Sequence, residues 1–74
     1  MNEDELYIAL GKQIKFLREN AHLTQEKLAE KAGISLDYLG KIEVHINKPG
    51  LKTLIQISNA LSVPLKTLFD FKNN

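Results

Sequence analysis

The segment between Leu23 and Glu43 constrains the fold of this chain more than any other part. It predicts two short helices that are joined by a tight turn at Gly33-Ile34-Ser35. Gly33 can adopt the left-handed conformation that ends a helix, because glycine has no Cβ atom. Ser35 can accept a hydrogen bond from the free amides that begin the next helix. The segment therefore predicts a pair of helices that cross at a steep angle.

Apolar residues three and four positions apart predict helices along the rest of the chain and no strand. We expect five helices, at about residues 4–20, from just after Thr24, at about 36–44, at about 51–61, and in a short segment opened by Pro64. We expect these side chains to face the core: Leu6, Leu10, Ile14, Leu17, Leu28, Ala29, Leu39, Ile42, Leu51, Leu54, Ile55, Ser58, Leu61, Leu65, Leu68 and Phe69. Gly11 should allow another helix to approach the first one closely, and residues 72–74 should fray.

The length and composition predict one globular domain that comprises residues 1–74. Hydrophobic residues make up 43% of the chain and charged residues 26%, a balance typical of a folded protein. No cysteine is present, so disulfides and cysteine-ligated zinc are excluded and a cytoplasmic location is favoured. No apolar run approaches the ~20 residues that span a bilayer, and the acidic N-terminus is not a secretory signal.

Short motifs and single residues occur along the chain from about residue 10 to residue 70 in an order and spacing that are informative together. They are Leu10-Gly11, Ile14, Leu17, Arg18, Leu23-Thr24-Gln25-Glu26, Leu28-Ala29, Gly33-Ile34-Ser35, Ile42-Glu43, Pro49, Leu51, Leu54, Ala60-Leu61 and Leu68-Phe69. In this order and spacing they resemble the Cro/C1-type (XRE-type) helix-turn-helix family, the fold of small phage repressors. The resemblance implies an all-α, compact five-helix bundle of the lambda-repressor-like DNA-binding type, with the helix-turn-helix at about residues 24–44.

Helical geometry sorts the side chains of the predicted helix at residues 36–44. At about 100° per residue, Leu39 and Ile42 point to the core. The opposite face carries Asp37, Gly40, Lys41 and Val44, with Leu36 at its N-terminal edge. In the resembling family this face enters the major groove of DNA, which makes Leu36, Asp37 and Lys41 the candidate base-contacting residues. Ser35 could touch a phosphate or a base edge, and Gly40 leaves room for close approach of the backbone to DNA.

The chemistry of these side chains suggests particular contacts. Lys41 can donate hydrogen bonds to guanine O6 and N7 or to a phosphate, and Leu36 can pack on a thymine methyl group. Two alternatives stand for Asp37. Its carboxylate could accept a hydrogen bond from a cytosine amino group, or it could cap the amides at the start of its helix.

Other candidates would contact the DNA backbone. Gln25 matches a family glutamine that contacts the backbone and braces a side chain of the recognition helix, although Leu36 offers no amide for this second role. The N-terminus of the helix that Gln25 begins also directs free amides towards a phosphate. Asn47 and Lys48 can bind phosphates. Tyr38 could reach a phosphate with its hydroxyl group or cover the edge of the core with its ring.

Two charged residues and two histidines are expected to serve the fold. Arg18 and Glu43 match family positions that form an ion pair between the first and third helices, and a partly buried charge needs such a partner. His22 and His45 stand at helix ends where the family often has glycine, and histidine tolerates left-handed conformations. We expect no metal site, because no cysteine or acid lies at ligand spacing from the histidines, and no cofactor.

The family resemblance and the candidate DNA-contacting residues predict a sequence-specific transcriptional regulator, a repressor. We expect it to bind double-stranded DNA as a homodimer on a two-fold symmetric operator. A single recognition helix contacts too few base pairs to select one genomic site, and a dimer doubles the contacts. The dimer surface could comprise the fifth helix and Phe71 with Ile8 or Phe16. We expect a prokaryotic or phage protein of the cytoplasm that associates with the nucleoid.

The charge distribution supports an alternative function. The net charge is only +1, and residues 1–40 hold five basic and seven acidic side chains against five and two in residues 41–74. The alternative is a protein-interaction module of the same fold, antitoxin-like or an adaptor, with weak or no DNA binding, which Asp37, Val44 and Ile46 favour. We expect no enzyme, because the chain has no Gly-rich phosphate loop and no catalytic constellation. No membrane association is expected. No small-molecule ligand is expected either, because no residues remain for a separate effector domain.

Overall fold

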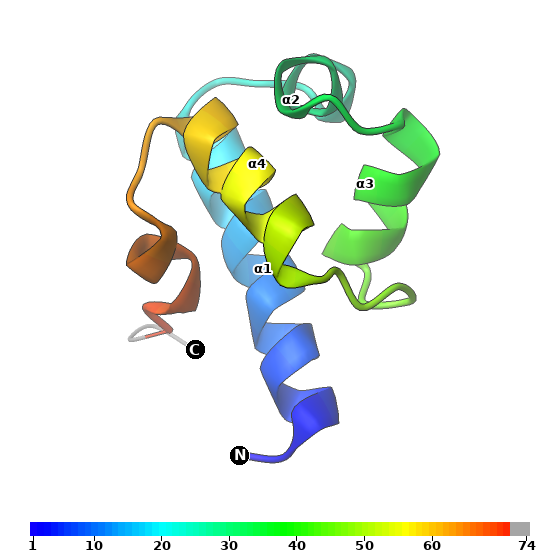
Figure 1. Ribbon diagram of the computed structural model, residues 1–74, viewed down its shortest axis with the longest axis vertical. Helices are drawn as coiled ribbons and strands as arrows, with labels where there is room; N and C mark the ends of the chain where they lie inside the picture. Colours follow the sequence, from blue (N-terminus) through cyan, green and yellow to red (C-terminus); the bar gives the residue numbers. More distant parts are fainter. Residues whose placement is uncertain (72–74) are drawn as a thin grey trace.

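The computed structural model describes residues 1–71, and the predicted frayed end at residues 72–74 lies outside the described residues. Residues 1–71 form four α-helices and one 3-10 helix, with no strand: α1 (Glu3–Asn20), α2 (Gln25–Ala32), α3 (Leu36–Glu43), α4 (Leu51–Leu61) and η1 (Leu65–Phe69). Figure 1 shows α1 along the length of the molecule, with α2 and α3 on one side of it and η1 on the other. The all-α prediction is confirmed, but the fifth element is a 3-10 helix and α3 ends at Glu43, one residue before the predicted end.

Polar side chains cap the helices where their sequence places them. The Thr24 hydroxyl accepts a hydrogen bond from the Lys27 amide at 3.0 Å, and the Ser35 hydroxyl accepts one from the Tyr38 amide at 3.0 Å. Gly33 ends α2 with a φ of 74°, in the left-handed region. These caps were predicted, and they fix the start of α3 relative to the end of α2.

Three residues other than glycine end a helix or follow it with a positive φ. They are His22 at 59°, His45 at 54° and Ser62 at 59°. The left-handed conformation of the two histidines agrees with the expectation for them. Ser62 carries the same strain at the end of α4, and the sequence analysis did not predict it.

The core lies where α1, α2, α3, α4 and η1 meet. Its most deeply buried side chains are Leu10, Ile14, Leu28, Leu39, Ile42, Ile57 and Leu68. A Cβ atom added to Gly11 would lie 2.5 Å from the carbonyl oxygen of Ile42, so α1 and α3 approach each other at the predicted glycine. The Gln13 Nε2 donates to the Thr67 carbonyl at 3.0 Å and ties α1 to η1.

Two parts of the predicted core were wrong. Leu51 and Ile55 are exposed, because α4 packs against α2 and η1 through a face rotated from the predicted one. The buried side chains of α4 are Leu54, Ile57, Ser58 and Leu61. Phe69 is also exposed. In a 3-10 helix residues three apart share a face, so Leu65 and Leu68 lie together and Phe69 points away from the core.

Candidate nucleic-acid interface

The inner side of α3 is fixed by a buried ion pair. The Arg18 guanidinium donates through Nε to Glu43 Oε2 at 2.8 Å and through Nη2 to Oε1 at 3.1 Å. Its Nη1 also donates to the carbonyl of Leu23 at 2.8 Å. The two side chains are only 10% and 1% exposed. A two-pronged contact of this kind fixes orientation as well as distance, so it holds the end of α3 against α1 and the start of the α2 segment.

Gln25 joins this network from the first residue of α2. Its Nε2 donates to Glu43 Oε1 at 2.9 Å, so this carboxylate oxygen receives hydrogen bonds from two side chains. Gln25 also lies beside Gly40, where an added Cβ atom would be 3.7 Å from Gln25 Oε1. The partner of Gln25 is therefore a carboxylate beneath α3, which the sequence analysis missed; the two residues are 18 positions apart.

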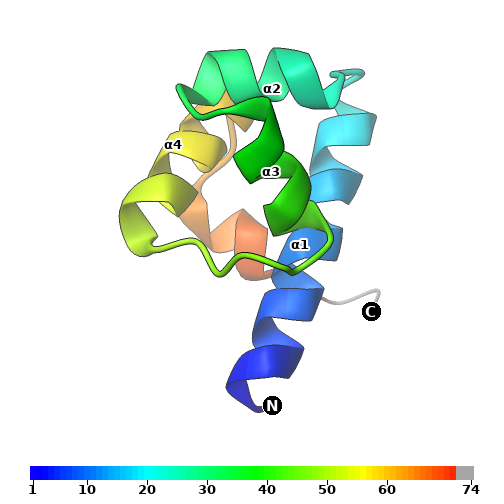
Figure 2. The same ribbon diagram turned by 90° about the vertical axis from the view of Figure 1, so that its right-hand side faces the viewer.

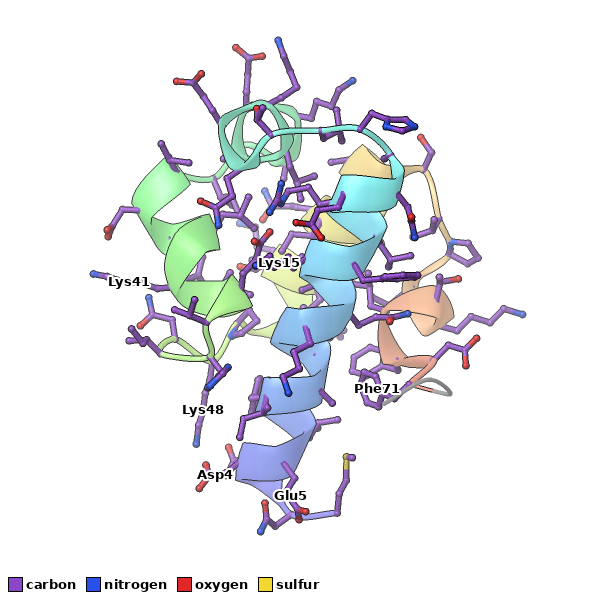
Figure 3. The ribbon with its side chains drawn as sticks, turned by 180° about the vertical axis from the view of Figure 1, so that it is seen from behind. Asp4, Glu5, Lys15, Lys41, Lys48 and Phe71 are labelled. Atoms are coloured by element: carbon purple, nitrogen blue, oxygen red, sulfur yellow. The ribbon has the colours of Figure 1, made fainter. Side chains whose placement is uncertain are left out.

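The outer side of α3 is exposed to solvent. Leu36 is 47% exposed at its N-terminal end. The Lys41 ammonium lies 3.0 Å from the Asp37 carboxylate, with side chains that are 46% and 78% exposed. Figure 3 shows Lys41 pointing away from the body of the molecule. The helix cap is provided by Ser35, and Asp37 pairs with Lys41. Asp37 and Lys41 are four residues apart, which is the spacing of a helical ion pair, so this pair could have been predicted from the sequence.

The loop after α3 folds back against the end of that helix. The amides of Ile46 and Asn47 both donate to the Lys41 carbonyl, at 2.8 and 3.2 Å. Asn47 is half-buried, whereas Val44 and Ile46 are exposed. Figure 2 shows α3 on the near side of the molecule, with α2 above it and this loop below it. The start of α2, the exposed side of α3 and the loop thus adjoin one another.

Lys48 lies against the N-terminal part of α1. Its Nζ is 3.1 Å from Asp4 Oδ1, 3.8 Å from Glu3 Oε2 and 5.7 Å from the centre of the Tyr7 ring. The hydrogen bond to Asp4 and the charge of Glu3 raise the pKa of Lys48 above its ordinary value. Lys48 is a predicted phosphate contact. Its acidic partners could not be predicted, because no local pattern relates residues 44 positions apart.

The remaining candidates fall into two groups. Tyr38 is half-buried and packs against the core. Phe16 is exposed on α1, and the rings of Phe69 and Phe71 lie edge to face with centres 6.3 Å apart. Figure 3 shows Phe71 and Lys41 on opposite sides of α1. Phe71, which was predicted for a dimer surface, therefore lies away from the exposed side of α3.

From residue 1 to residue 71, no helix has both the length and the apolar character needed to cross a membrane. The same part of the chain contains no group of three or more His, Cys, Asp or Glu side chains placed to hold a metal ion.

The chain is similar to known proteins that contain a helix-turn-helix domain. The family model described as helix-turn-helix matches residues 14–68. The immunity repressor protein of Bacillus phage phi105 is 38% identical over 61 residues, which cover 82% of this chain and 42% of that protein. The solved N-terminal DNA-binding domain of SinR from Bacillus subtilis has 35% identity and a TM-score of 0.80, and the match covers 88% of this chain and 96% of that one.

A second solved structure has the same fold. The restriction-modification controller protein C.AhdI from Aeromonas hydrophila is 27% identical with a TM-score of 0.84, over 85% of this chain and 96% of that one. The curated full-length relatives are longer, since this chain spans 42% of the phage repressor and 59% of full-length SinR.

Proposed function

The chain belongs to the Cro/C1-type helix-turn-helix family, and from this premise we propose that it is a sequence-specific DNA-binding transcriptional regulator that acts as a repressor. The family is one of DNA-binding regulators and not of enzymes. An immunity repressor and the regulator SinR are among its relatives. We propose that residues 1–74 act as one DNA-binding domain in the cytoplasm of a prokaryotic or phage-infected cell.

The observation that carries this proposal is the contrast between the two sides of α3. The inner side is held by Leu39, Ile42 and Glu43, which are all buried. The outer side is exposed, and the major groove of B-DNA admits an α-helix. A helix that is rigidly held on one side and exposed on the other can present side chains to base edges at fixed positions.

The proposed contacts follow from the outer side chains. Lys41 donates to guanine or to a phosphate, and Leu36 packs against a thymine methyl group. Once Lys41 turns to DNA, the Asp37 carboxylate can accept a hydrogen bond from a cytosine amino group or repel a wrongly placed phosphate. Ser35, Tyr38, Gly40 and Asn47 border this surface. Gln25 contacts the DNA backbone from the start of α2, and Lys48 contacts it from the loop after α3.

A homodimer would double these contacts. Its two recognition helices would occupy half-sites whose centres lie about 34 Å apart, one turn of duplex. The aromatic residues Phe16 and Phe71, with Ile8 and η1, are the proposed dimer surface. The position of Phe71 across α1 from Lys41 supports this choice, because dimerisation there leaves the outer side of α3 accessible.

Selection of bound sequences from a random DNA pool tests the proposed function. We expect enrichment of a two-fold symmetric sequence with half-site centres about one helical turn apart. Enrichment of a single half-site would contradict the dimer, and the absence of any enrichment would contradict sequence-specific binding.

A second candidate function is supported by the exposed Val44 and Ile46. Apolar side chains beside α3 suit a protein partner better than they suit phosphates, as in an antitoxin-like or adaptor module. Salt dependence separates the two functions. A DNA-binding regulator should lose affinity with a log–log slope of about −0.9 per phosphate contact, whereas the binding of an apolar protein partner should change little with salt.

A further inference from the structure

The N-terminal part of α1 presents acidic side chains to a lysine that the proposed function assigns to DNA. Lys48 Nζ lies within 4 Å of two carboxylates, those of Asp4 at 3.1 Å and Glu3 at 3.8 Å. The ring of Tyr7 lies 5.7 Å from the same ammonium group. Figure 3 shows Lys48 directed from its loop towards Asp4. We call Glu3, Asp4 and Tyr7 the α1 acidic turn.

The α1 acidic turn is ordered by its own helix cap. The Asn2 side chain accepts a hydrogen bond from the Glu5 amide at 2.8 Å, and the Glu5 carboxylate accepts one from the Asn2 amide at 3.0 Å. This capping box holds the first turn in helical form. Tyr7 follows Glu3 and Asp4 by four and three positions, so the three side chains share one edge of the helix. The helical first turn therefore places the partners of Lys48 near its ammonium group in the free protein.

The contacts of Lys48 with Asp4 and Glu3 are exposed to solvent, so another anion can replace them. The side chains of Glu3 and Asp4 are 70% and 80% exposed, and that of Lys48 is 47% exposed. Exposed ion pairs of this kind are weak and are screened by salt. A DNA phosphate that approaches Lys48 must nonetheless replace the carboxylates or tolerate their negative charge nearby. Phosphate and carboxylate compete for one ammonium group.

We propose that the α1 acidic turn is an intramolecular competitor of DNA, which holds Lys48 in the free protein and releases it to a backbone phosphate on binding. The inference rests on the proposed function, because it requires Lys48 to meet a phosphate. The contact lowers affinity for every DNA sequence alike, since phosphate contacts carry no base information. It thereby weakens specific and non-specific binding by the same factor and leaves the base preference unchanged.

Two isosteric substitutions separate this competition from general charge repulsion. Asp4→Asn removes one negative charge that Lys48 contacts, and Glu5→Gln removes one negative charge from the next residue, which instead caps the helix. Glutamine also serves in a capping box, so both variants should keep the circular dichroism spectrum of the original protein. Affinity for a mixed-sequence duplex of about 20 base pairs, roughly two helical turns, is measured by fluorescence anisotropy at low salt.

We expect Asp4→Asn to tighten binding by about two- to fivefold more than Glu5→Gln does, the range of an exposed ion pair. This difference should shrink as salt is raised and vanish when Lys48→Ala is also present. Equal gains from the two substitutions, or a difference that persists without Lys48, would overturn the inference and leave the proposed function standing. Failure of the original protein and of all variants to bind DNA would overturn the proposed function and the inference with it.

Discussion

The two sides of α3 each carry an ion pair, and the two pairs differ in almost everything except their charges. Arg18 and Glu43 meet beneath the helix with side chains 10% and 1% exposed, and a second donor, Gln25, binds the same carboxylate. Asp37 and Lys41 meet above it with side chains 78% and 46% exposed. Burial therefore decides whether an ion pair stabilises the fold or remains available to a ligand.

The physical cause is the medium around each pair. Removing one partner of a buried pair leaves an uncompensated charge out of water, which costs far more than the pair itself contributes. Removing one partner of an exposed pair leaves a charge that water solvates, so the cost is small. Lys41 and Lys48 both belong to the exposed class, and a phosphate or a base can replace their carboxylate partners.

The largest effect is expected from breaking the inner pair. Glu43→Gln should lower the free energy of unfolding by about 3–5 kcal/mol, because it leaves the Arg18 guanidinium buried without a countercharge. Urea denaturation followed by circular dichroism measures the change. The double variant Arg18→Met/Glu43→Leu should be more stable than Glu43→Gln alone. A double variant that is equally unstable would show that the pair contributes through its shape and not through its charges.

A smaller loss of stability is expected where α1 approaches α3. Gly11→Ala should lower the free energy of unfolding by about 1–3 kcal/mol, because the added methyl group meets the Ile42 carbonyl oxygen and overpacks the contact. Gly40→Ala is the matched control on the outer side of α3, where the nearest atom, Gln25 Oε1, lies at an ordinary 3.7 Å. Equal losses at the two glycines would mean that the inner and outer sides are not packed differently.

The outer side is tested by its base preference. Lys41→Ala should relax the preference at one position per half-site by roughly 1–3 kcal/mol if Lys41 contacts a base. Lys48→Ala should instead weaken binding to all sequences alike and reduce the salt slope by about 0.9. Affinities for a selected operator and its single-base variants measure both effects. Uniform weakening by Lys41→Ala would reassign this lysine to the DNA backbone.

The smallest effect is expected from the outer ion pair on stability. Asp37→Asn should change the free energy of unfolding by less than about 0.5 kcal/mol, as exposed pairs one helical turn apart do. Its urea midpoint should therefore lie close to that of the original protein. A loss as large as that of Glu43→Gln would remove the distinction between the two pairs.

Local features of the fold could be predicted from the sequence because nearby residues determine them. Thr24, Gly33 and Ser35 carry the caps and the turn in their own chemistry, and Leu39 and Ile42 fall on the buried side of α3 by helical spacing alone. These residues therefore determine which side of α3 is buried and which side is exposed.

Other features depend on how separate elements meet, and these were missed. The contact of Lys48 with Asp4 joins residues 44 positions apart, and that of Gln25 with Glu43 joins residues 18 positions apart. The buried face of α4 was misassigned because Leu51 and Ile55 fit an apolar helical pattern, although α2 and η1 contact the neighbouring face. The pattern of one helix does not state which face its neighbours will cover.

An NMR titration of the ¹⁵N-labelled protein with a selected operator duplex tests most directly whether the outer side of α3 meets DNA. We expect the largest changes in amide chemical shift in residues 35–41 and at Asn47 and Lys48. The amides of Phe16 and Phe71, which are proposed for the dimer surface, should shift much less. Shifts that concentrate on that surface while α3 stays unchanged would contradict the account.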